Sequence, residues 1–484
     1  MLEFEPQELA PLLFVNSILL RLPQQRGPPI TKEDGSVVIP LQDLSAGESR
    51  SDPSSSDSIE NYDKTTQSWR TNPKIAVWVI IGAIFLDSVF YSIVIPILPF
   101  YVESLGLEQI QVGILFASFP FAYLISAPIC IWAVDKLGRK KSMMISVVLI
   151  EISSIGFALS NQYWLLLLCR SIQGFCSNLT WTSGMVMVAV SFKPQEQGVY
   201  LGTMFAVAGA GTLLGPFMGG LAFEFSGYDK RVPFLIVSGL LFVDGVMRSF
   251  LKDVGKPAQK SKNSPWRIFT SPKALALAFV VSVSQGGPAA LEPLVPVYLA
   301  DSYGLSPAWI GGLFAVAICG FVLGSLLMGW FSDKYPHWRI HAVSAAAIIT
   351  AGFAALLIHT PNLLFFTLSL FIFLFLAGIL NTPILPEVMR IVARDVGPGH
   401  EAAVSGLCNC AYSIGASVGA AGVSALYEVT DLNVCMYTLS GIYVFVCILV
   451  ISVVLRGKIF SVPKIEEHQL LSASLEEEST SAVE

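Results

Sequence analysis

Two acidic residues stand near the middle of strongly apolar segments. Asp87 lies within Phe85-Leu-Asp-Ser-Val-Phe, and Glu292 lies within Ala290-Leu-Glu-Pro-Leu-Val. An apolar environment disfavours the charged form of a carboxyl group, so such a group can take up and release protons near neutral pH. Both residues are therefore candidate proton-coupling residues. The alternative for each is a carboxyl group that only bonds to a neighbouring helix.

Other kinds of site chemistry find less support in the sequence. The eight cysteines are scattered, and they do not show the spacing of a zinc-binding motif. A nucleophile, a base and an orienting group do not converge in any segment. We therefore expect no enzyme activity, no metal site and no cofactor.

The composition indicates that water is not the main solvent of this chain. Hydrophobic residues make up 54% of the 484 residues and charged residues only 13%, whereas charged residues are about 25% of an ordinary soluble domain. The mean hydropathy is +0.65. A net charge of −6 provides no basic field for phosphates, so a nucleic-acid partner is not expected.

Many of the apolar segments are long enough to cross a bilayer. A hydrocarbon layer of ~30 Å requires about 20 helical residues. The candidate spans lie near 75–99, 111–134, 142–160, 163–190, 199–223, 232–251, 273–299, 308–331, 340–359, 362–386, 403–426 and 434–455. The sequence therefore predicts an all-α membrane protein with twelve transmembrane helices in two halves of six.

Polar segments set the predicted boundaries of these halves. Ser, Asp, Pro and Gln accumulate from Gln42 to Asn72, so residues 1–73 are expected to be a disordered extension. Residues 458–484 form a polar, acidic tail. The six-helix halves cover 74–251 and 273–457. The linker 252–272 carries four lysines, which predicts a cytosolic location by the positive-inside rule. With an even number of helices, both termini are then cytosolic.

Both halves carry a charged turn after their second helix. Such internal repetition is typical of transporters that are built from two related halves. The basic character of both turns also favours a cytosolic location. The residues that stand out in the two turns are Asp135, Gly138, Arg139, Lys140, Asp333 and Lys334.

The first turn resembles the loop signature G-x-x-x-D-R-x-G-R-K-x of the major facilitator superfamily, although Ile131 stands where the signature has Gly. The resemblance implies two halves related by a pseudo-two-fold axis and a gating role for the loop. Charge-assisted bonds at a helix end can hold two helices together on one side of the membrane and break when that side opens. Charges that only set the membrane topology are the alternative.

Two further stretches are similar to signatures of this superfamily, R-x-x-Q-G in helix four and G-x(3)-G-P-x(2)-G-G in helix five of its antiporter branch. An Arg at membrane depth costs at least ~2.5 kcal/mol, so it should face a partner or a cavity. Closely spaced glycines permit close helix approach, and the proline frees a carbonyl, which implies a hinge. Glycine packing without a hinge is the alternative. The matching residues are Arg170, Gln173 and Gly174, then Gly211, Gly215, Pro216, Gly219 and Gly220.

The surroundings of Asp87 and Glu292 resemble the first and seventh helices of the drug:proton antiporters and vesicular amine transporters. In that branch, a basic residue in helix two and acidic residues in helices ten and eleven complete the relay and the amine site. The comparable positions here hold Phe119, Asn381 and Asn409. The chain therefore departs from the amine-site pattern, and a monoamine substrate is not expected.

The same positions predict the lining of a substrate cavity. A neutral or weakly cationic amphipathic solute would suit a cavity with polar and aromatic walls. The predicted polar lining consists of Asn381, Glu387, Asn409 and Tyr412, and the aromatic lining of Phe119, Phe121, Trp132 and Trp181.

Together these features predict a secondary active transporter that exchanges protons for a small organic solute by alternating access. Its expected partners are the solute, protons and the lipid bilayer, and we expect it to act as a monomer. The membrane is either the plasma membrane or an internal vesicular or vacuolar membrane. The alternatives are a facilitator without proton coupling and a sensor that has kept the transporter fold.

Overall fold

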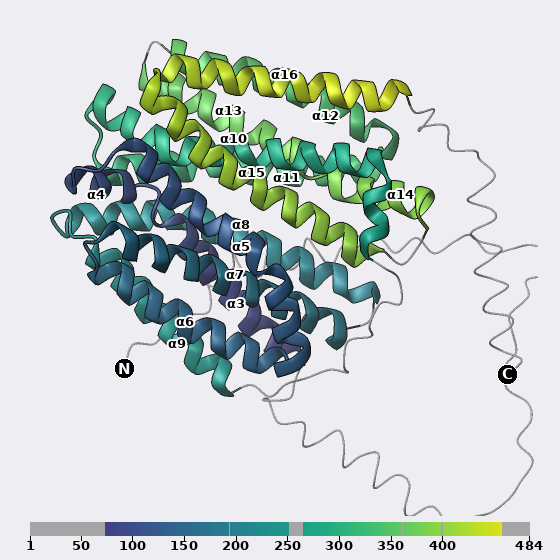
Figure 1. Cartoon of the computed structure of the whole chain (residues 1–484), viewed down its shortest axis with the longest axis horizontal. Helices are drawn as coiled ribbons and strands as arrows, with labels where there is room; N and C mark the ends of the chain where they lie inside the picture. Colours follow the sequence, from purple (N-terminus) through teal and green to yellow (C-terminus); the bar gives the residue numbers. More distant parts are fainter. Residues whose placement is uncertain (1–72, 193, 251–264, 361, 398–399, 457–484) are drawn as a thin grey trace, which may run out of the picture. The chain divides into compact units, whose positions relative to one another are not determined.

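The computed structural model describes residues 73–192, 194–250, 265–360, 362–397 and 400–456, and the elements in these ranges are helices. The predicted tail 458–484 and nearly all of the predicted extension 1–73 lie outside the described residues. Most of the predicted linker 252–272 does so as well. Figure 1 shows the helices coloured along the sequence, with those of the first half in purple to teal and those of the second half in green to yellow.

Within its described residues, the first half contains six long helices and one short one. Their order follows the predicted spans, with the short helix α4 directly after the first long helix. The helices are α3 (Pro73–Ser92), α4 (Leu98–Ser104), α5 (Gln109–Leu137), α6 (Arg139–Leu159), α7 (Tyr163–Ser191), α8 (Pro194–Phe225) and α9 (Arg231–Phe250).

The second half repeats this plan. Short 3-10 helices, η3 to η5, accompany its α-helices, and a short helix follows the fourth long one. The elements are η3 (Pro265–Thr270), α10 (Pro272–Tyr303), α11 (Pro307–Lys334), η4 (Pro336–Trp338), α12 (Arg339–Leu356), η5 (Leu357–His359), α13 (Leu363–Asn381), α14 (Ile384–Asp395), α15 (Glu401–Val429) and α16 (Leu432–Arg456).

The prediction of twelve spanning helices in two halves is confirmed. Within the described residues, eleven helices are long and apolar enough to cross a membrane. The twelfth is α7, whose 29 residues include a polar stripe. Arg170, Gln173, Ser177 and Asn178 on this helix are all buried. Its low hydropathy thus reflects polar side chains that face the protein interior and not the lipid.

Two predicted spans are interrupted near a proline. The first span continues beyond α3 through turns that contain Pro96 and then forms α4. The tenth divides at Thr382-Pro383 into α13 and α14. Proline lacks the N–H that an α-helix uses in its interior, which favours an interruption at these points, although Pro120 and Pro128 lie inside the uninterrupted helix α5. Neither break changes the number of crossings.

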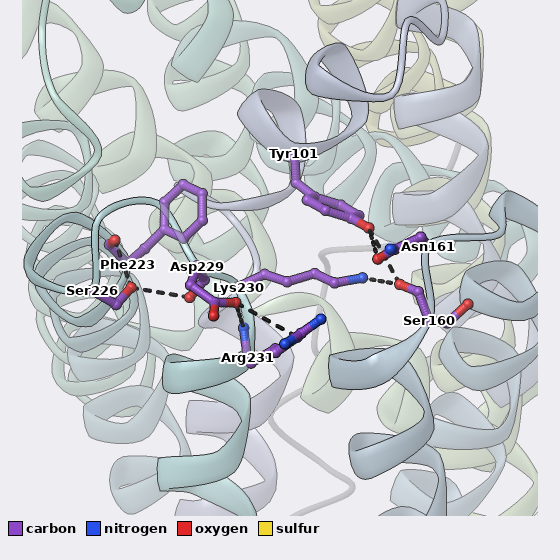
Figure 2. Close-up of polar contacts among 8 residues, drawn as sticks. All are labelled: Tyr101, Ser160, Asn161, Phe223, Ser226, Asp229, Lys230 and Arg231. Carbon is purple, nitrogen blue, oxygen red and sulfur yellow. Dashed lines mark hydrogen bonds and ion pairs between the residues drawn. The ribbon is translucent and has the colours of Figure 1, made fainter.

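A buried lysine joins two loops and helix α4 at one end of the first half. Lys230, which is only 4% exposed, extends from the α8–α9 loop, as Figure 2 shows. Its ammonium group donates to the carbonyl oxygen of Ser160 and lies 3.9 Å from the centre of the Tyr101 ring. The Tyr101 hydroxyl donates to Oδ1 of Asn161 over 2.9 Å. Burial, and to a lesser extent the neighbouring Arg231, lower the pKa of Lys230 to about 8.

Candidate functional site

Asp87 accepts two hydrogen bonds deep inside the first half. It lies on α3 and is 5% exposed. Its Oδ2 atom accepts a hydrogen bond from the Ser177 hydroxyl over 2.6 Å and another from Nε1 of Trp181 over 3.2 Å. Both donors stand on α7, one helical turn apart, so they present their polar groups to the same carboxylate. Asp87 is thus a buried carboxylate held by neutral donors.

Glu292 joins the second half to the first. It stands on α10, and the hydroxyl of Tyr91 on α3 lies 3.1 Å from both of its carboxylate oxygens. Tyr91 follows Asp87 by one helical turn on α3, so the two predicted coupling carboxylates belong to one polar cluster. The Tyr91–Glu292 bond crosses the interface between the halves. A change in the charge or protonation of Glu292 can therefore alter the contact between the halves.

Arg170 interacts electrostatically with both carboxylates. Its side chain is fully buried and is within electrostatic range of both Asp87 and Glu292. It donates to the backbone oxygen of Tyr91 over 3.0 Å and to Oε1 of Gln173 over 3.2 Å. An Arg in an apolar bundle requires such neighbours. The helix-four signature therefore supplies the central cation of the cluster.

Gly174 explains why Phe119 takes part in this cluster. A Cβ atom at Gly174 would collide with the backbone oxygen of Phe119, so only glycine lets α7 approach α5 this closely. The Arg170 guanidinium then lies 4.7 Å from the centre of the Phe119 ring. This spacing suits a cation–π contact. The structure thus places the aromatic ring of Phe119 against the buried Arg170.

Two buried donors of the cluster have no protein partner among the described residues. They are Nε of Arg170 and Nε2 of Gln173. A buried donor without a hydrogen bond costs about 1–3 kcal/mol. Water or a polar solute would satisfy both donors.

The predicted cavity residues divide into two groups. Tyr412 on α15 lies within electrostatic range of Glu292 and Tyr91, although its side chain is 43% exposed. Trp181 and Phe119 also lie at the cluster. Tyr412 is thus the predicted lining residue of the second half that lies near the cluster, and its role in a cavity stays a prediction.

The remaining lining candidates lie elsewhere in the helices. Glu387 on α14 is buried, and its Oε1 forms an ion pair of 2.5 Å with Arg390 on the same helix. Asn381 ends α13, and Asn409 is exposed on α15. Phe121 and Trp132 on α5 are both more than half exposed. The contacts described for these residues do not join them to the Asp87 cluster.

The helix-five glycines pack α8 tightly onto the segment that carries Asp87. A Cβ atom at Gly211, Gly215 or Gly219 would collide with backbone atoms of Phe85 and Val89 on α3 and of Ile93 directly after it, respectively. The three glycines are spaced one turn apart and present a flat face to this segment. Gly220 and Pro216 lie against α11 of the second half instead. Close packing is therefore evident, and a hinge at Pro216 stays a prediction.

The charged turns occupy one end of the bundle. Gly138 separates α5 from α6 with a φ of 85°, a left-handed conformation that favours glycine. Lys140 donates to the backbone oxygen of Ser249 over 2.9 Å, which ties this turn to the end of α9. In the second half, the ammonium group of Lys334 lies 5.1 Å from the centre of the Trp330 ring. Asp135 and Asp333 are both exposed.

Sequence reasoning missed an ion pair that the structure places close to Asp87. Asp244 and Arg248 on α9 are both 5% exposed in their side chains and lie 2.5 Å apart. Arg248 is within electrostatic range of Asp87. The sequence does contain a signal, because an acidic and a basic residue four positions apart in an apolar helix are placed to form a pair.

Twelve spanning helices in two halves, with a buried polar cluster that joins the halves, are the architecture of a membrane transporter. The family model of the Major Facilitator Superfamily matches residues 80–420. The chain belongs to this superfamily.

Relatives of this chain include vesicular acetylcholine and amine transporters. The chain is 27% identical to a vesicular acetylcholine transporter of Drosophila melanogaster over 403 residues, which cover 75% of this chain and 69% of the relative. It is 28% identical to a synaptic vesicular amine transporter of Homo sapiens over 327 residues, which cover 66% of this chain and 62% of that protein. The predicted resemblance to the vesicular amine transporter branch is confirmed.

Solved structures share the fold at low sequence identity. The nucleoside transporter NupG superposes with a TM-score of 0.62 at 15% identity, covering 79% of this chain and 99% of that one. A bacterial homologue of the human lysosomal transporter Spinster, in an inward-facing and unoccupied conformation, gives a TM-score of 0.61 at 16% identity, covering 81% and 96%. These similarities bear on the fold alone.

Proposed function

We propose that this protein is a proton antiporter that moves a small organic solute across a membrane of an internal vesicle-type compartment. The observation that carries the proposal is the hydrogen bond between Tyr91 and Glu292, because it makes the contact between the halves depend on a carboxylate. Arg170 connects this carboxylate electrostatically to Asp87. The names of the vesicular relatives support transport of a small organic solute and the internal membrane.

The geometry supports an exchange cycle with protons and solute as competing occupants of the cluster. Ionised Asp87 and Glu292 together balance the Arg170 cation and leave negative charge that a proton or a cationic group can neutralise. Protonation of Glu292 removes the charge from its bond with Tyr91 and weakens the link between the halves. Binding of a proton or of solute would thereby favour different arrangements of the halves, which is the requirement for coupling.

The lining supports an amphipathic solute that is neutral or weakly cationic. Trp181 and Phe119 provide aromatic surface next to the cluster, and Tyr412 adds a hydroxyl group. The amide side chains of Asn381 and Asn409, together with Glu387, would complete the lining in other states of the cycle. Two vesicular relatives are named for acetylcholine and amines, and this chain would share the aromatic part of such a site.

The charged turns would act as the cytosolic gate of the same cycle. In this proposal Asp135, Arg139 and Lys140 in the first half, and Asp333 and Lys334 in the second, form bonds when the cytosolic side closes. Both termini and the linker 252–272 would face the cytosol, and the protein would act as a monomer. The basic residues near these turns support that orientation.

Proton flux can be measured in purified protein reconstituted in vesicles that enclose a pH-sensitive dye. Acetylcholine and a panel of aromatic amines and neutral amphipathic compounds serve as external probes, with the vesicle interior acidified. We expect a subset of probes to accelerate proton efflux in the wild-type protein. Asp87→Asn should abolish pH-driven uptake of such a probe but leave its exchange down a solute gradient.

Ser171→Ala is the matched control, because the Ser171 hydroxyl bonds only the backbone of its own helix at Leu167. It should leave both activities unchanged. Uptake of equal rate with and without a pH gradient, unaffected by Asp87→Asn, would show a facilitator. Binding of a probe without any movement across the membrane would show a sensor. Either result would overturn antiport.

A further inference from the structure

Helices of opposite halves meet in two matching pairs, α5 with α15 and α8 with α11 (Figure 1). In the first pair, a Cβ atom at Gly113 would collide with Ser424 and with the backbone of Ala420. In the second pair, a Cβ atom at Gly311 would collide with the backbone of Pro216. Each glycine is the fifth residue of its helix, so the two contacts occupy equivalent positions.

In each helix pair, a glutamate side chain adds a hydrogen bond between the halves. Oε2 of Glu428 accepts a hydrogen bond from the backbone N–H of Ile110 over 3.3 Å, and Oε2 of Glu224 accepts one from the N–H of Ala308 over 3.1 Å. Each glutamate is the penultimate residue of its own helix, and each acceptor meets the second residue of a helix in the other half. The two bonds are therefore equivalent under the pseudo-two-fold relation.

These bonds use groups that a helix leaves unsatisfied. The first N–H groups of an α-helix have no partner within the helix, and the aligned peptide dipoles place partial positive charge there. A carboxylate is the favoured acceptor at this position. Here the acceptor comes from the opposite half, so each bond caps a helix and joins the halves in the same contact.

Both bonds lie at the end of the bundle that is remote from the charged turns. Ile110 and Asp135 stand near opposite ends of α5, which corresponds to roughly 38 Å along a helix. A third bond at the same end, from Nε2 of Gln109 to the backbone oxygen of Pro293 over 2.8 Å, also crosses between the halves. The described hydrogen bonds between the halves therefore lie either at this end or at the contact between Tyr91 and Glu292.

We propose that Glu224 and Glu428 are a pair of gate residues that close the end of the transporter opposite the charged turns. The inference rests on the proposed alternating access. The flat contacts at Gly113 and Gly311 bring the helices close enough for each glutamate to reach its N–H group. When the two bonds break, the two glycines contribute no side chains of their own that would resist separation. Opening at this end therefore requires the loss of both carboxylate bonds.

A distance measurement between spin labels tests the gate directly. The labels replace Phe225 on α8 and Trp309 on α11, which are 86% and 69% exposed and flank the Glu224 bond. The eight native cysteines are replaced in this background. In the wild-type protein we expect mainly short distances. Glu224→Ala and Glu428→Ala should each raise the ratio of open to closed molecules about tenfold, and the double variant by roughly a hundredfold.

Conservative variants and a control separate gating from helix stability. Glu224→Gln and Glu428→Gln keep an acceptor oxygen but lose the charge, so a smaller shift in the same direction is expected, even if an alanine variant fails to fold. Gln111→Ala removes a bond at the start of α5 that stays within one half, from the Glu108 N–H to Gln111 Oε1 over 2.9 Å. It should leave the distances unchanged.

Unchanged distances in the double variant would overturn the gate, and so would an equal shift in Gln111→Ala. The measurement needs neither a solute nor a pH gradient. A failure of the gate therefore leaves proton antiport standing, whereas a failure of the dye assay leaves the gate standing.

Discussion

The Ser177 hydroxyl lies 2.6 Å from Oδ2 of Asp87, and the two residues belong to helices that are distant in sequence. Hydrogen bonds to charged groups contribute about 1.5–3 kcal/mol. Ser177→Ala should therefore weaken the ionised form of Asp87 and lower the rate of proton-driven uptake by about tenfold or more. Vesicle uptake under a pH gradient provides the measurement. An effect as large in Ser171→Ala would show that α7 is sensitive to any loss of a hydroxyl group.

The buried pair of Asp244 and Arg248 should show strong coupling. Removal of one partner leaves an uncompensated charge and costs about 3–5 kcal/mol for a buried pair. Asp244→Asn and Arg248→Gln alone should each lower the unfolding temperature in detergent more than the double variant does. If the unfolding temperature of the double variant falls by the sum of the two single decreases, the two side chains are not coupled.

The glycine face of α8 should not tolerate a methyl group. Gly215→Ala introduces a Cβ atom that collides with Val89 on α3, which we expect to lower expression and thermal stability sharply. Gly202 lies on the same helix, and a Cβ atom there would meet no atom within 4 Å. Gly202→Ala should be neutral or stabilising by up to about 1 kcal/mol, because alanine favours helices. Equal effects of the two changes on the unfolding temperature would refute the packing explanation.

The lowered pKa of Lys230 predicts a pH dependence of stability. Its folded-state pKa is about 8, below the ordinary value of 10.5, so between these values the unfolded chain binds more protons than the folded one. Stability should then rise with pH from about 8 to 10.5. Lys230→Met removes this titration. The unfolding temperature of the wild type minus that of the variant should increase over this range, and a constant difference would contradict the prediction.

The fold could be predicted largely from apolar segment lengths, because a bilayer fixes how many helical residues a crossing needs. The breaks near Pro96 and Pro383 follow from proline chemistry, but their effect on helix ends depends on packing. Asp87 and Glu292 could be selected as isolated carboxylates. Their connection through Tyr91 and Arg170 could not, because it depends on how two distant helices face each other.

The bonds of Glu224 and Glu428 are even harder to predict from the sequence. Each glutamate stands near a helix end with no motif around it, and its partner is a backbone N–H group that any residue can supply. Sequence pattern alone does not distinguish such a residue from a solvated one. The relation becomes visible only when both halves are compared in three dimensions.

Helix α8 contacts both α3 and α11 through backbone, with glycines on one face against the helix of Asp87 and Pro216 and Gly220 on another against the second half. No layer of flexible side chains separates these three backbones at the contact points. Movement of α8 away from α11 would therefore be transmitted to α3 with little loss. We therefore expect α8 to couple movement near Glu224 to the position of Asp87.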